Sequence, residues 1–272
     1  MTKKLAIVGA GMMGEALARG LFASGWSPAD LVLVDIRGDR LDEIGTALGV
    51  DTSSDSADAC GRAAGVLLAV KPQDAPTALQ TISSSIGSSG LVSIVAGLST
   101  ASIEEHLGHG SSVVRAMPNT PARVGKGVTA LATGSHATKA TRNLAEAVFA
   151  AVGPVVWLDE AQLDAVTALS GSGPAYVFYL AEAMVDAGIE LGLAKDVAST
   201  LVFATIEGAG VMLQQTGEQP AVLRQQVTSP GGTTAAAIEV LESKAVRGSI
   251  VDALRAARDR SEELGRGGSS RA

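Results

Sequence analysis

Aromatic residues, cysteine and clustered positive charge are all scarce in this chain of 272 residues. Aromatic side chains make up 3% of the sequence, whereas glycine contributes 32 residues. The packing therefore has to rest on Ala, Val, Leu and Ile, with many close approaches between backbones. That composition favours helices packed tightly on a sheet or on one another.

The single cysteine, Cys60, has no partner for an internal disulfide. The segment MTKKLAIVGAG at the start lacks the apolar core and the cleavage site of a secretory signal. The sequence also shows no run of about 18 apolar residues, the length that a membrane span needs. These absences predict a soluble, cytoplasmic protein that does not enter a membrane.

Basic residues are neither abundant nor clustered. Acidic side chains number 28 against 21 basic ones, and the formal net charge is −7. Because phosphate contacts need clustered cations, the charge pattern argues against a nucleic-acid partner. His106, His109 and His136 lack metal-ligand spacing, and Cys60 has no basic neighbour in sequence. We therefore expect no metal site and no catalytic role for these four residues.

The first part of the chain alternates short apolar runs with helical patterns. Such runs between helices are typical of a parallel sheet that is covered on both faces. Residues 1–160 are therefore predicted to form an α/β domain with a doubly wound, Rossmann-type sheet. The expected strands are residues 5–9, 31–35, 66–70, 91–96, 113–118, 128–133 and 155–158.

After about residue 160 the strand pattern disappears and helical patterns continue to residue 264. Two helices in the middle of this part are apolar around much of their circumference, more than a small helical unit can bury alone. Residues 161–264 are therefore predicted to be an all-helical dimerisation domain, and the protein a homodimer. The glycine- and serine-rich end, residues 265–272, is expected to be a disordered tail.

The segment GAGMMG lies between the first predicted strand and the first helix and contributes Gly9, Ala10, Gly11, Met12, Met13 and Gly14. Its glycines have the G-x-G-x-x-G spacing: the first allows a tight turn, the second lets a pyrophosphate reach the backbone, and the third lets helix and strand pack closely. The motif alone is weak. Here it opens a strand–turn–helix–strand unit whose second strand ends in Asp35, where a ribose-binding acid is expected, so we predict a dinucleotide site.

The residues after the second strand give conflicting signals about the cofactor. Asp35 favours NADH, because a carboxylate accepts from the ribose 2′-hydroxyl and repels a 2′-phosphate. Arg37 and Arg40 follow it and are able to clamp that phosphate. The residues leave NADH and NADPH both open.

Two further segments, AVKPQ (69–73) and MPNTPARVGKG (117–127), follow predicted strands and face the same crevice as the glycine loop. Lys71 suits either this site or a solvated loop, and Asn119 either the site or a turn. Gly-Ser-Gly-Pro (171–174) predicts a break between two helices, with Ser172 as a cap and Pro174 in the next first turn, although a small-residue hinge near the cleft is consistent with the same sequence.

The segment VTSPGGTTAAAIEVLE (227–242) allows two interpretations. In one, Ser229 or Thr233 caps the helix that follows. In the other, the glycines leave backbone N–H groups open at a helix N-terminus, which suits a carboxylate, with the hydroxyl of Thr234 beside it. Taken alone, the segment favours capping.

Together these segments resemble the pyrroline-5-carboxylate reductase family. The matching pieces are VGAGMMGEAL, LLAVKPQ, VRAMPNTPARVGKGVTAL, QLDAVTALSGSGPAYVF and VTSPGGTTAAAIEVLE, in the family's order and over nearly the whole chain. The last two are highly specific, whereas GAGMMG is shared by many dehydrogenases. The resemblance implies reduction of 1-pyrroline-5-carboxylate to L-proline with NADPH or NADH, the final step of proline biosynthesis. It also implies an interleaved dimer, often assembled further into a ring of dimers.

The resemblance assigns roles to individual residues. The substrate, a cyclic imino acid, would rest its carboxylate on the N–H groups of Ser229 to Thr233, including Gly231 and Gly232. Thr234 would be the catalytic hydroxyl near the ring nitrogen, and Glu218 matches an acidic residue that contacts this nitrogen. The segments expected to border the dinucleotide comprise Ala69, Val70, Lys71, Pro72, Val95, Ala96, Gly97 and Asn119.

This chain departs from the family at two positions. Ser56 stands near the place of an asparagine that relatives use for the adenosine, and Asp35 stands where small polar residues are common. Although the family leans to NADPH, Asp35 argues partly for NADH. Two rival functions stay open: another reductase with a Rossmann and a helical domain, such as a β-hydroxyacid dehydrogenase or an F420-linked NADP reductase, and a dinucleotide-sensing protein without turnover.

Overall fold

The computed structural model describes residues 4–108 and 110–269. Contacts divide the chain into two compact units. Unit 1 comprises residues 1–172 together with 257–272, and unit 2 comprises residues 173–256. The chain therefore leaves unit 1 after Ser172 and returns to it within its last helix, whereas the sequence suggested a single division at residue 161.

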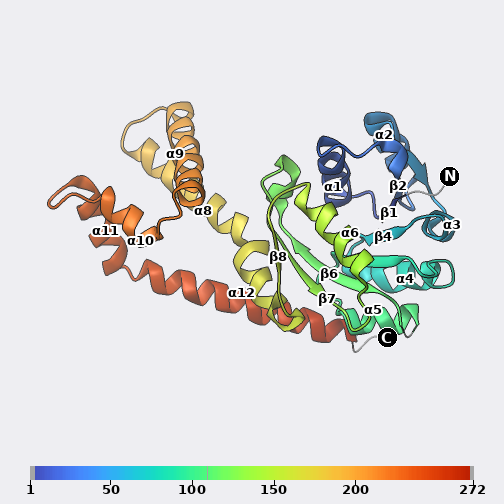
Figure 1. Ribbon diagram of the computed structural model, residues 1–272. Coiled ribbons are helices and arrows are strands. Elements are labelled where there is room, and N and C mark those ends of the chain that lie inside the picture. Colours follow the sequence, from blue (N-terminus) through green and yellow to red (C-terminus); the bar gives the residue numbers. More distant parts are fainter. Residues whose placement is uncertain (1–3, 109, 270–272) are drawn as a thin grey trace. The chain divides into compact units, whose positions relative to one another are not determined.

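Among the described residues, eight strands of unit 1 form one sheet in the order β3-β2-β1-β4-β5-β6-β7-β8 (Figure 1). The strands are β1 Leu5–Val8, β2 Leu31–Val34, β3 Asp51–Ser53, β4 Gly65–Leu68, β5 Gly90–Ser93, β6 Val113–Pro118, β7 Thr129–Thr133 and β8 Val155–Trp157. The helices of this unit are α1 Met12–Ala23, α2 Gly38–Leu48, α3 Ser56–Gly61, α4 Ala75–Ser83, α5 Thr100–Leu107, α6 Lys139–Ala150 and α7 Leu163–Val166.

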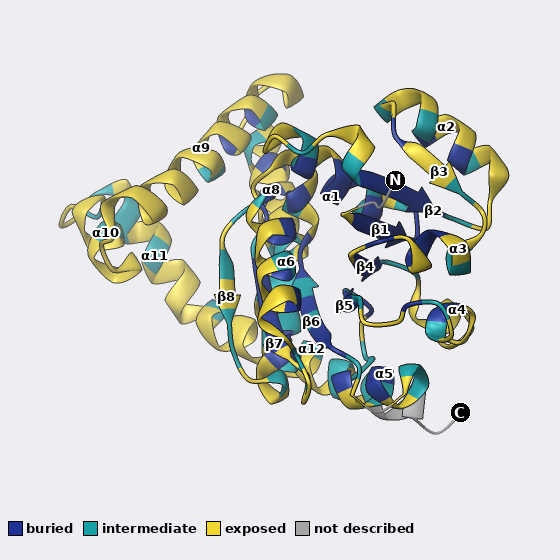
Figure 2. Cartoon of the chain, turned by 45° about the vertical axis from the view of Figure 1, so that its right-hand side comes forward, coloured by how far each residue is buried: buried dark blue, intermediate teal, exposed yellow. Residues whose placement is uncertain are grey.

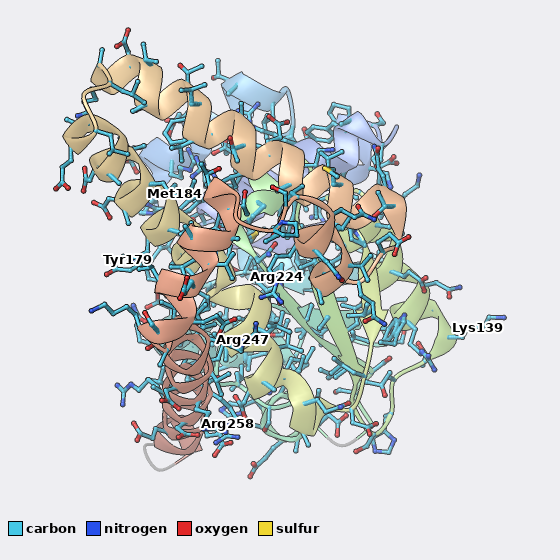
Figure 3. The ribbon with its side chains drawn as sticks, turned by 90° about the vertical axis from the view of Figure 1, so that its left-hand side faces the viewer. Lys139, Tyr179, Met184, Arg224, Arg247 and Arg258 are labelled. Carbon is cyan, nitrogen blue, oxygen red and sulfur yellow. The ribbon has the colours of Figure 1, made fainter. Side chains whose placement is uncertain are left out.

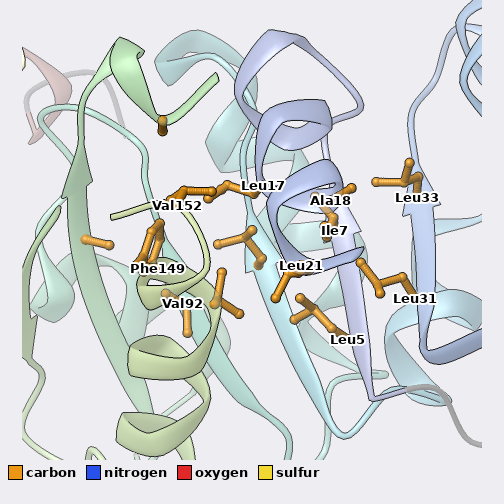
Figure 4. Close-up of a cluster of buried hydrophobic side chains, with 14 of the residues drawn as sticks. Leu5, Ile7, Leu17, Ala18, Leu21, Leu31, Leu33, Val92, Phe149 and Val152 are labelled. Atoms are coloured by element: carbon orange, nitrogen blue, oxygen red, sulfur yellow. The ribbon is translucent and has the colours of Figure 1, made fainter. Parts of the chain in front are cut away.

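Helices cover both faces of this sheet. Successive residues of a strand point to opposite faces, so each inner strand contributes side chains to two cores. Leu5 and Ile7 of β1 pack in a core with α1, α2 and α6, whereas Ala6 and Val8 pack in a second core with α3, α4 and α5. Figure 4 shows the first core, where Leu17 and Leu21 of α1 and Phe149 of α6 lie over the strands. The doubly wound α/β fold predicted from the apolar runs is confirmed.

Two features of the sheet differ from the predicted one. β3, a short polar edge strand, was not predicted because Asp51 and Thr52 are exposed and carry no apolar signal. β7 runs antiparallel to β6, although all the other pairs are parallel. The reason is that a 3₁₀ turn, Thr120–Val124, joins β6 to β7 in place of a crossover helix, so the chain turns back beside β6.

Unit 2 is entirely helical in its described residues, as predicted. Its helices are α8 Gly173–Glu190, α9 Lys195–Thr216, α10 Pro220–Gln226, α11 Thr233–Ser243 and the first part of α12 Val246–Ser269. Buried apolar side chains are few here, namely Ala181 and Val185 of α8 against Ala198 and Val202 of α9. Figure 2 shows the contrast between the buried strands of unit 1 and the exposed helices α9 and α10.

The C-terminal end of α12 corrects one expectation. Helix α12 continues to Ser269, so residues 265–269 are helical and not part of a disordered tail, while 270–272 lie outside the described residues. The helix end is held to unit 1, since the Ser261 hydroxyl donates to Asp164 Oδ1 at 2.6 Å. Gly265 lies against Gly97 of the loop after β5.

Candidate active site

The glycine loop lies at the carboxyl end of β1 and leads into α1. Gly9 has a φ of +108°, and a Cβ built on it would lie 2.4 Å from the Ala69 carbonyl oxygen. A Cβ on Gly14 would lie 2.1 Å from the Gly9 carbonyl oxygen. Neither position accepts a larger residue without moving the backbone, because the loop packs directly on β4 and on α1.

Gly11 is different. A Cβ on Gly11 would meet nothing within 4 Å, so the space beside this residue is open. Gly11 is also the N-cap of α1, and no side chain caps that helix. Met12 follows with an exposed side chain, and Met13 packs partly on the core. An open, uncapped helix N-terminus of this kind fits a pyrophosphate.

Asp35, directly after β2, holds the glycine loop. Its Oδ2 accepts from the Ala10 amide at 3.0 Å, and its Oδ1 accepts from Nε of Arg37 at 3.0 Å. Burial by itself would raise the pKa of Asp35, but the hydrogen bonds from Arg37 and Ala10 outweigh it and lower the pKa below its usual value. The carboxylate is therefore charged at neutral pH and already bonded to the protein.

Arg40 of α2 faces the same loop and not the solvent. Its Nε donates to the Ala10 carbonyl oxygen at 2.7 Å, and its other nitrogens bond Glu43 and Glu15. The hydrogen bond from Arg40 is the largest influence on Glu15 and lowers the pKa of that carboxyl group. The sequence did not reveal this contact, because Glu15 and Arg40 lie 25 residues apart with no motif that links them.

The other predicted cofactor residues of unit 1 are brought to the same edge of the sheet. The parallel register aligns Val8 with Val34 and with Leu68, and Leu68 with Ser93, so the segments that follow these residues lie beside the glycine loop. Ala69 and Val70 are half-buried there, Lys71 and Pro72 are exposed, and Ser56 opens α3 after β3. Val95 turns its side chain into the core, while Ala96 is exposed.

Asn119 follows β6 at this edge, but its side chain is occupied. Its Nδ2 donates to the Ser170 carbonyl oxygen at 3.1 Å, and its Oδ1 accepts from the Val128 amide at 3.0 Å. The side chain is almost fully buried. In this structure the amide group therefore joins three chain segments.

The segment around Ser170 is a π-helical turn over Thr167–Gly171, and the predicted break follows it at Ser172, before α8 begins at Gly173 with Pro174 in its first turn. The Ser172 amide donates to the Thr167 carbonyl oxygen at 2.8 Å, and Ser172 itself has helical φ and ψ of −84° and −17°. Ser172 therefore does not act as an N-cap, because an N-cap is typically extended. A widened helical turn thus lies between α7 and the bend at Ser172, and such π-helical turns are frequent at functional sites.

The N-terminus of α11 excludes the capping interpretation of the SPGGTT segment. Its N-cap is Gly232, with extended φ and ψ of −81° and 171°, and no side-chain hydrogen bond caps it. The prediction that Ser229 or Thr233 caps the helix is wrong. Ser229 instead accepts the Gly232 amide on its carbonyl oxygen at 3.0 Å, within a turn in which Gly231 has a φ of +69°.

The first-turn amides of α11 therefore have no side-chain cap. Thr233 is exposed and Thr234 is half-buried. Glu218, another predicted substrate residue, is exposed in the loop between α9 and α10, where its amide donates to Thr216 Oγ1 at 3.2 Å. All the predicted substrate residues lie in unit 2, and all the predicted cofactor residues in unit 1.

Unit 2 also carries a broad exposed apolar face. Figure 3 labels Tyr179 and Met184 on α8, and the former is 76% exposed. Most of the face belongs to α8 and α9 and comprises Val177, Phe178, Tyr179, Leu180, Met184, Ile189, Val197, Leu201, Phe203, Val211, Met212 and Leu213. Large apolar surfaces of this kind mark interaction sites.

Helix α9, Lys195–Thr216, is long and apolar enough by length and composition to cross a membrane. The helix reaches this threshold by its average hydropathy, although Thr205 and Glu207 interrupt its apolar residues, so it contains no unbroken apolar run of about 18 residues. The helix packs on α8 through Ala198 and Val202, and its remaining apolar residues belong to the exposed face. A helix that is buried by a protein partner has the same composition.

Cys60 and the histidines are the residues for which the sequence predicted no catalytic or metal-binding role. Cys60 is buried, and burial raises the pKa of its thiol to about 12. His106 bonds the Ser102 carbonyl oxygen through Nδ1, and His109 lies outside the described residues. No cluster of His, Cys, Asp or Glu able to hold a metal ion occurs in residues 4–108 and 110–269.

Two family models match the chain. Residues 160–264 match "Pyrroline-5-carboxylate reductase dimerisation", and residues 4–97 match "NADP oxidoreductase coenzyme F420-dependent". The second match covers part of the dinucleotide-binding half only, so it does not favour a deazaflavin reductase for the whole chain.

Similar proteins cover both halves. The pyrroline-5-carboxylate reductase of Corynebacterium melassecola is 39% identical over 266 residues, which are 96% of this chain and 98% of that protein. The structure of a pyrroline-5-carboxylate reductase from Coxiella burnetii has a TM-score of 0.91 and 39% identity, covering 97% of this chain and 99% of that one. Plasmodium falciparum pyrroline carboxylate reductase, solved with NADP bound, has a TM-score of 0.86 and 28% identity over 97% of this chain and 98% of that one.

Proposed function

This chain belongs to the pyrroline-5-carboxylate reductase family, and we propose that the two uncapped helix N-termini described above hold its cofactor and its substrate. The protein is an NAD(P)H-dependent oxidoreductase that reduces 1-pyrroline-5-carboxylate to L-proline, the final step of proline biosynthesis. The observation that carries the site assignment is the glycine N-cap of α11, which leaves the first-turn amides without a side-chain acceptor.

The cofactor half of the proposal rests on the glycine loop. The open space at Gly11 and the uncapped start of α1 suit the pyrophosphate, while Gly9 and Gly14 keep the loop close to β4 and α1. Ala69 to Pro72 and Ala96 to Gly97 border the dinucleotide with their backbones, and Ser56 lies on the adenosine side. When bound, the reduced nicotinamide supplies a hydride to the C=N carbon of the substrate.

The substrate half rests on the start of α11. Its amides and the positive end of its helix dipole stabilise the substrate carboxylate without a cationic side chain. The small residues Gly231 and Gly232 allow a ligand to approach this backbone closely. Holding the flat imine in one orientation provides much of the catalysis, since hydride transfer depends on the alignment of the reacting atoms.

Thr234 is the proposed catalytic residue. It is the second residue of α11, in the first turn whose amides are proposed to receive the carboxylate. The hydroxyl is too weak an acid to be a free proton donor at neutral pH, so its role is to orient the ring nitrogen by a hydrogen bond or to relay a proton through water. Glu218 is a second proposed contact to the nitrogen.

The exposed face of α8 and α9 is the proposed homodimer interface, in the half of the chain that matches the dimerisation family. Dimers of this kind are further proposed to assemble into a ring. The unpaired, buried Cys60 suits the reducing cytoplasm, which is the proposed location.

The test is oxidation of NADPH and of NADH in the presence of 1-pyrroline-5-carboxylate, with the six-membered cyclic imino acid as a comparison. We expect turnover with the five-membered ring and formation of L-proline. Cofactor binding without any oxidation would identify a dinucleotide-sensing protein and overturn the proposal.

A further inference from the structure

The strongest unassigned feature of the molecule is the set of hydrogen bonds around Ala10, the residue between the first two glycines of the loop. Its amide donates to Asp35 Oδ2 at 3.0 Å, and its carbonyl oxygen accepts from Arg40 Nε at 2.7 Å. Both polar groups of one loop residue are thus bonded by charged side chains from the next strand and helix. We propose that Arg40 is a positioning residue that aims the glycine loop at the pyrophosphate of either cofactor, and not a recognition residue for a 2′-phosphate. This inference rests on the proposed function.

The geometry explains how a side chain on α2 can act on the ligand. In a trans peptide the C=O of one residue and the N–H of the next point in opposite directions. Arg40 holds the Ala10 carbonyl, so it also fixes the direction of the Gly11 N–H on the other side of the same peptide group. Gly11 is the loop residue beside open space and the N-cap of α1. Because the Gly11 N–H is already fixed in direction, ligand binding does not lose the conformational entropy of ordering it.

Arg40 has little freedom to do anything else. Its side chain is 16% exposed, and its Nε, NH1 and NH2 groups bond Ala10, Glu43 and Glu15 respectively. A move toward a 2′-phosphate would abandon all three acceptors. Arg37, by contrast, is 56% exposed and bonds Asp35 at the carboxyl end of β2. The structure therefore divides the two arginines, with loop geometry assigned to Arg40 and cofactor discrimination to Arg37.

Glu15 supports the same role. It lies in the first turn of α1, where its negative charge would oppose a pyrophosphate. Arg40 bonds it from one side and Arg19 from the other, the latter at 2.7 Å. Arg40 thus neutralises a nearby carboxylate while it holds the loop, and both effects are independent of what the ribose carries.

The experiment compares Arg40→Met with two matched variants, Arg19→Met and Arg37→Met. Arg19→Met removes a guanidinium from the same carboxylate, Glu15, without touching the loop. Two readouts avoid turnover: amide hydrogen exchange of residues 9–14 in the cofactor-free protein, and the Kd of NADPH and of NADH from nicotinamide fluorescence. All variants are measured well below their Tm, so that the folded state predominates in every sample.

We expect Arg40→Met to accelerate exchange in the glycine loop and to raise both Kd values by the same factor, roughly 10- to 100-fold for a lost hydrogen bond to a charged group. Arg19→Met should leave loop exchange unchanged and raise both Kd values less than Arg40→Met does, because it exposes the charge of Glu15 without releasing the loop. Arg37→Met should raise the Kd of NADPH alone and leave loop exchange as in the wild type.

A rise in the NADPH Kd alone for Arg40→Met would make Arg40 a phosphate clamp and overturn the inference, and so would unchanged loop exchange. If Arg40→Met does not fold, Glu15→Gln replaces it with loop exchange as the readout, because this change weakens the hold on Arg40 and should accelerate exchange to a smaller extent, whereas the charge that it removes alters the Kd by itself. A wild-type protein that binds neither cofactor would contradict the proposed function, while the exchange data would still decide whether Arg40 orders the loop.

Discussion

The side-chain amide of Asn119 donates to the carbonyl oxygen of Ser170 at 3.1 Å, although the two residues are 51 positions apart in the sequence. Ser170 belongs to the π-helical turn that precedes α8, and Asn119 follows β6 at the carboxyl edge of the sheet. The contact ties the widened helix to the edge where the glycine loop lies. Asn119 thus connects elements of unit 1 that the sequence could not associate.

Asn119→Ala should therefore lower stability more than an ordinary loop substitution. It leaves the Val128 amide and the Ser170 carbonyl without their partner in a partly buried place, and we expect a loss of about 2 kcal/mol in the free energy of unfolding, the low end of about 1–3 for each of the two groups. Urea denaturation measures it. Asn119→Asp is the control, since it keeps the acceptor for Val128 and should cost less. Unchanged stability with a raised KM for NADPH would show that the amide serves the cofactor instead.

Thr234→Ala should lower kcat by roughly 10- to 1000-fold, the effect of losing a positioned group for proton transfer. Thr234→Ser keeps the hydroxyl at the same place in the first turn of α11 and should retain most of the activity. Steady-state kinetics at saturating NADPH separate the two variants. Equal kcat and KM for wild type and Thr234→Ala would remove Thr234 from the mechanism.

Gly232→Ser should weaken substrate binding while it strengthens the helix. Gly232 has an extended N-cap conformation that serine adopts readily, and a serine hydroxyl there accepts a first-turn amide. The added Cβ would lie 2.4 Å from the Ser229 hydroxyl, which can rotate away, and 3.1 Å from the Ser229 carbonyl oxygen, which requires a small backbone shift. We expect the KM for the imino acid to rise several-fold, because the hydroxyl competes with the carboxylate. Ala237→Ser, one turn later, is the control that should leave KM unchanged.

Much of the fold could be predicted because strands that are buried on both faces consist of unbroken runs of apolar residues. LAIV of β1 and LVLV of β2 supply alternate residues to the two cores, and their positions follow directly from the sequence. β3 was missed because an exposed edge strand such as Asp51–Ser53 needs no apolar side chains. The direction of β7 was missed because an apolar run does not indicate the direction of a strand. The direction follows instead from the short connection between β6 and β7, which contains no crossover helix.

The site was predicted less completely than the fold, because some of its contacts leave no pattern in the sequence. Glycines at fixed spacing reveal close backbone approaches, and Gly9 and Gly14 show these contacts in the structure. Side-chain partners distant in sequence leave no such pattern, so the bonds of Arg40 to Ala10 and Glu15 were not found. The cap of α11 was misassigned since a hydroxyl residue near a helix start is ambiguous until the backbone is known, and here the backbone makes Gly232 the N-cap.

Charges placed on the exposed face of α8 and α9 should dissociate the proposed dimer. Phe178 is 66% exposed and Phe203 is 60% exposed, and aromatic side chains of this kind dominate the energy of an interface. Phe178→Asp combined with Phe203→Asp should therefore give a monomer by light scattering at micromolar concentration. Val124→Asp, a change at a residue of unit 1 that is 75% exposed, is the control and should leave the mass unchanged. A dimer that survives the double substitution would place the interface elsewhere.

Cys60 should be inert in the native protein and should make stability fall at high pH. Burial raises the pKa of its thiol from 9.0 to about 12, so the nucleophilic thiolate is almost absent at pH 8. A thiol reagent should react slowly with the folded protein and rapidly in denaturant. The unfolded thiol ionises first as the pH rises, because the folded pKa is the higher one. The contribution of Cys60 to stability is therefore complete below pH 9.0 and is lost progressively toward pH 12. Cys60→Ala should flatten this part of the stability profile, and a profile with the same slope in both proteins would show that other groups cause the loss.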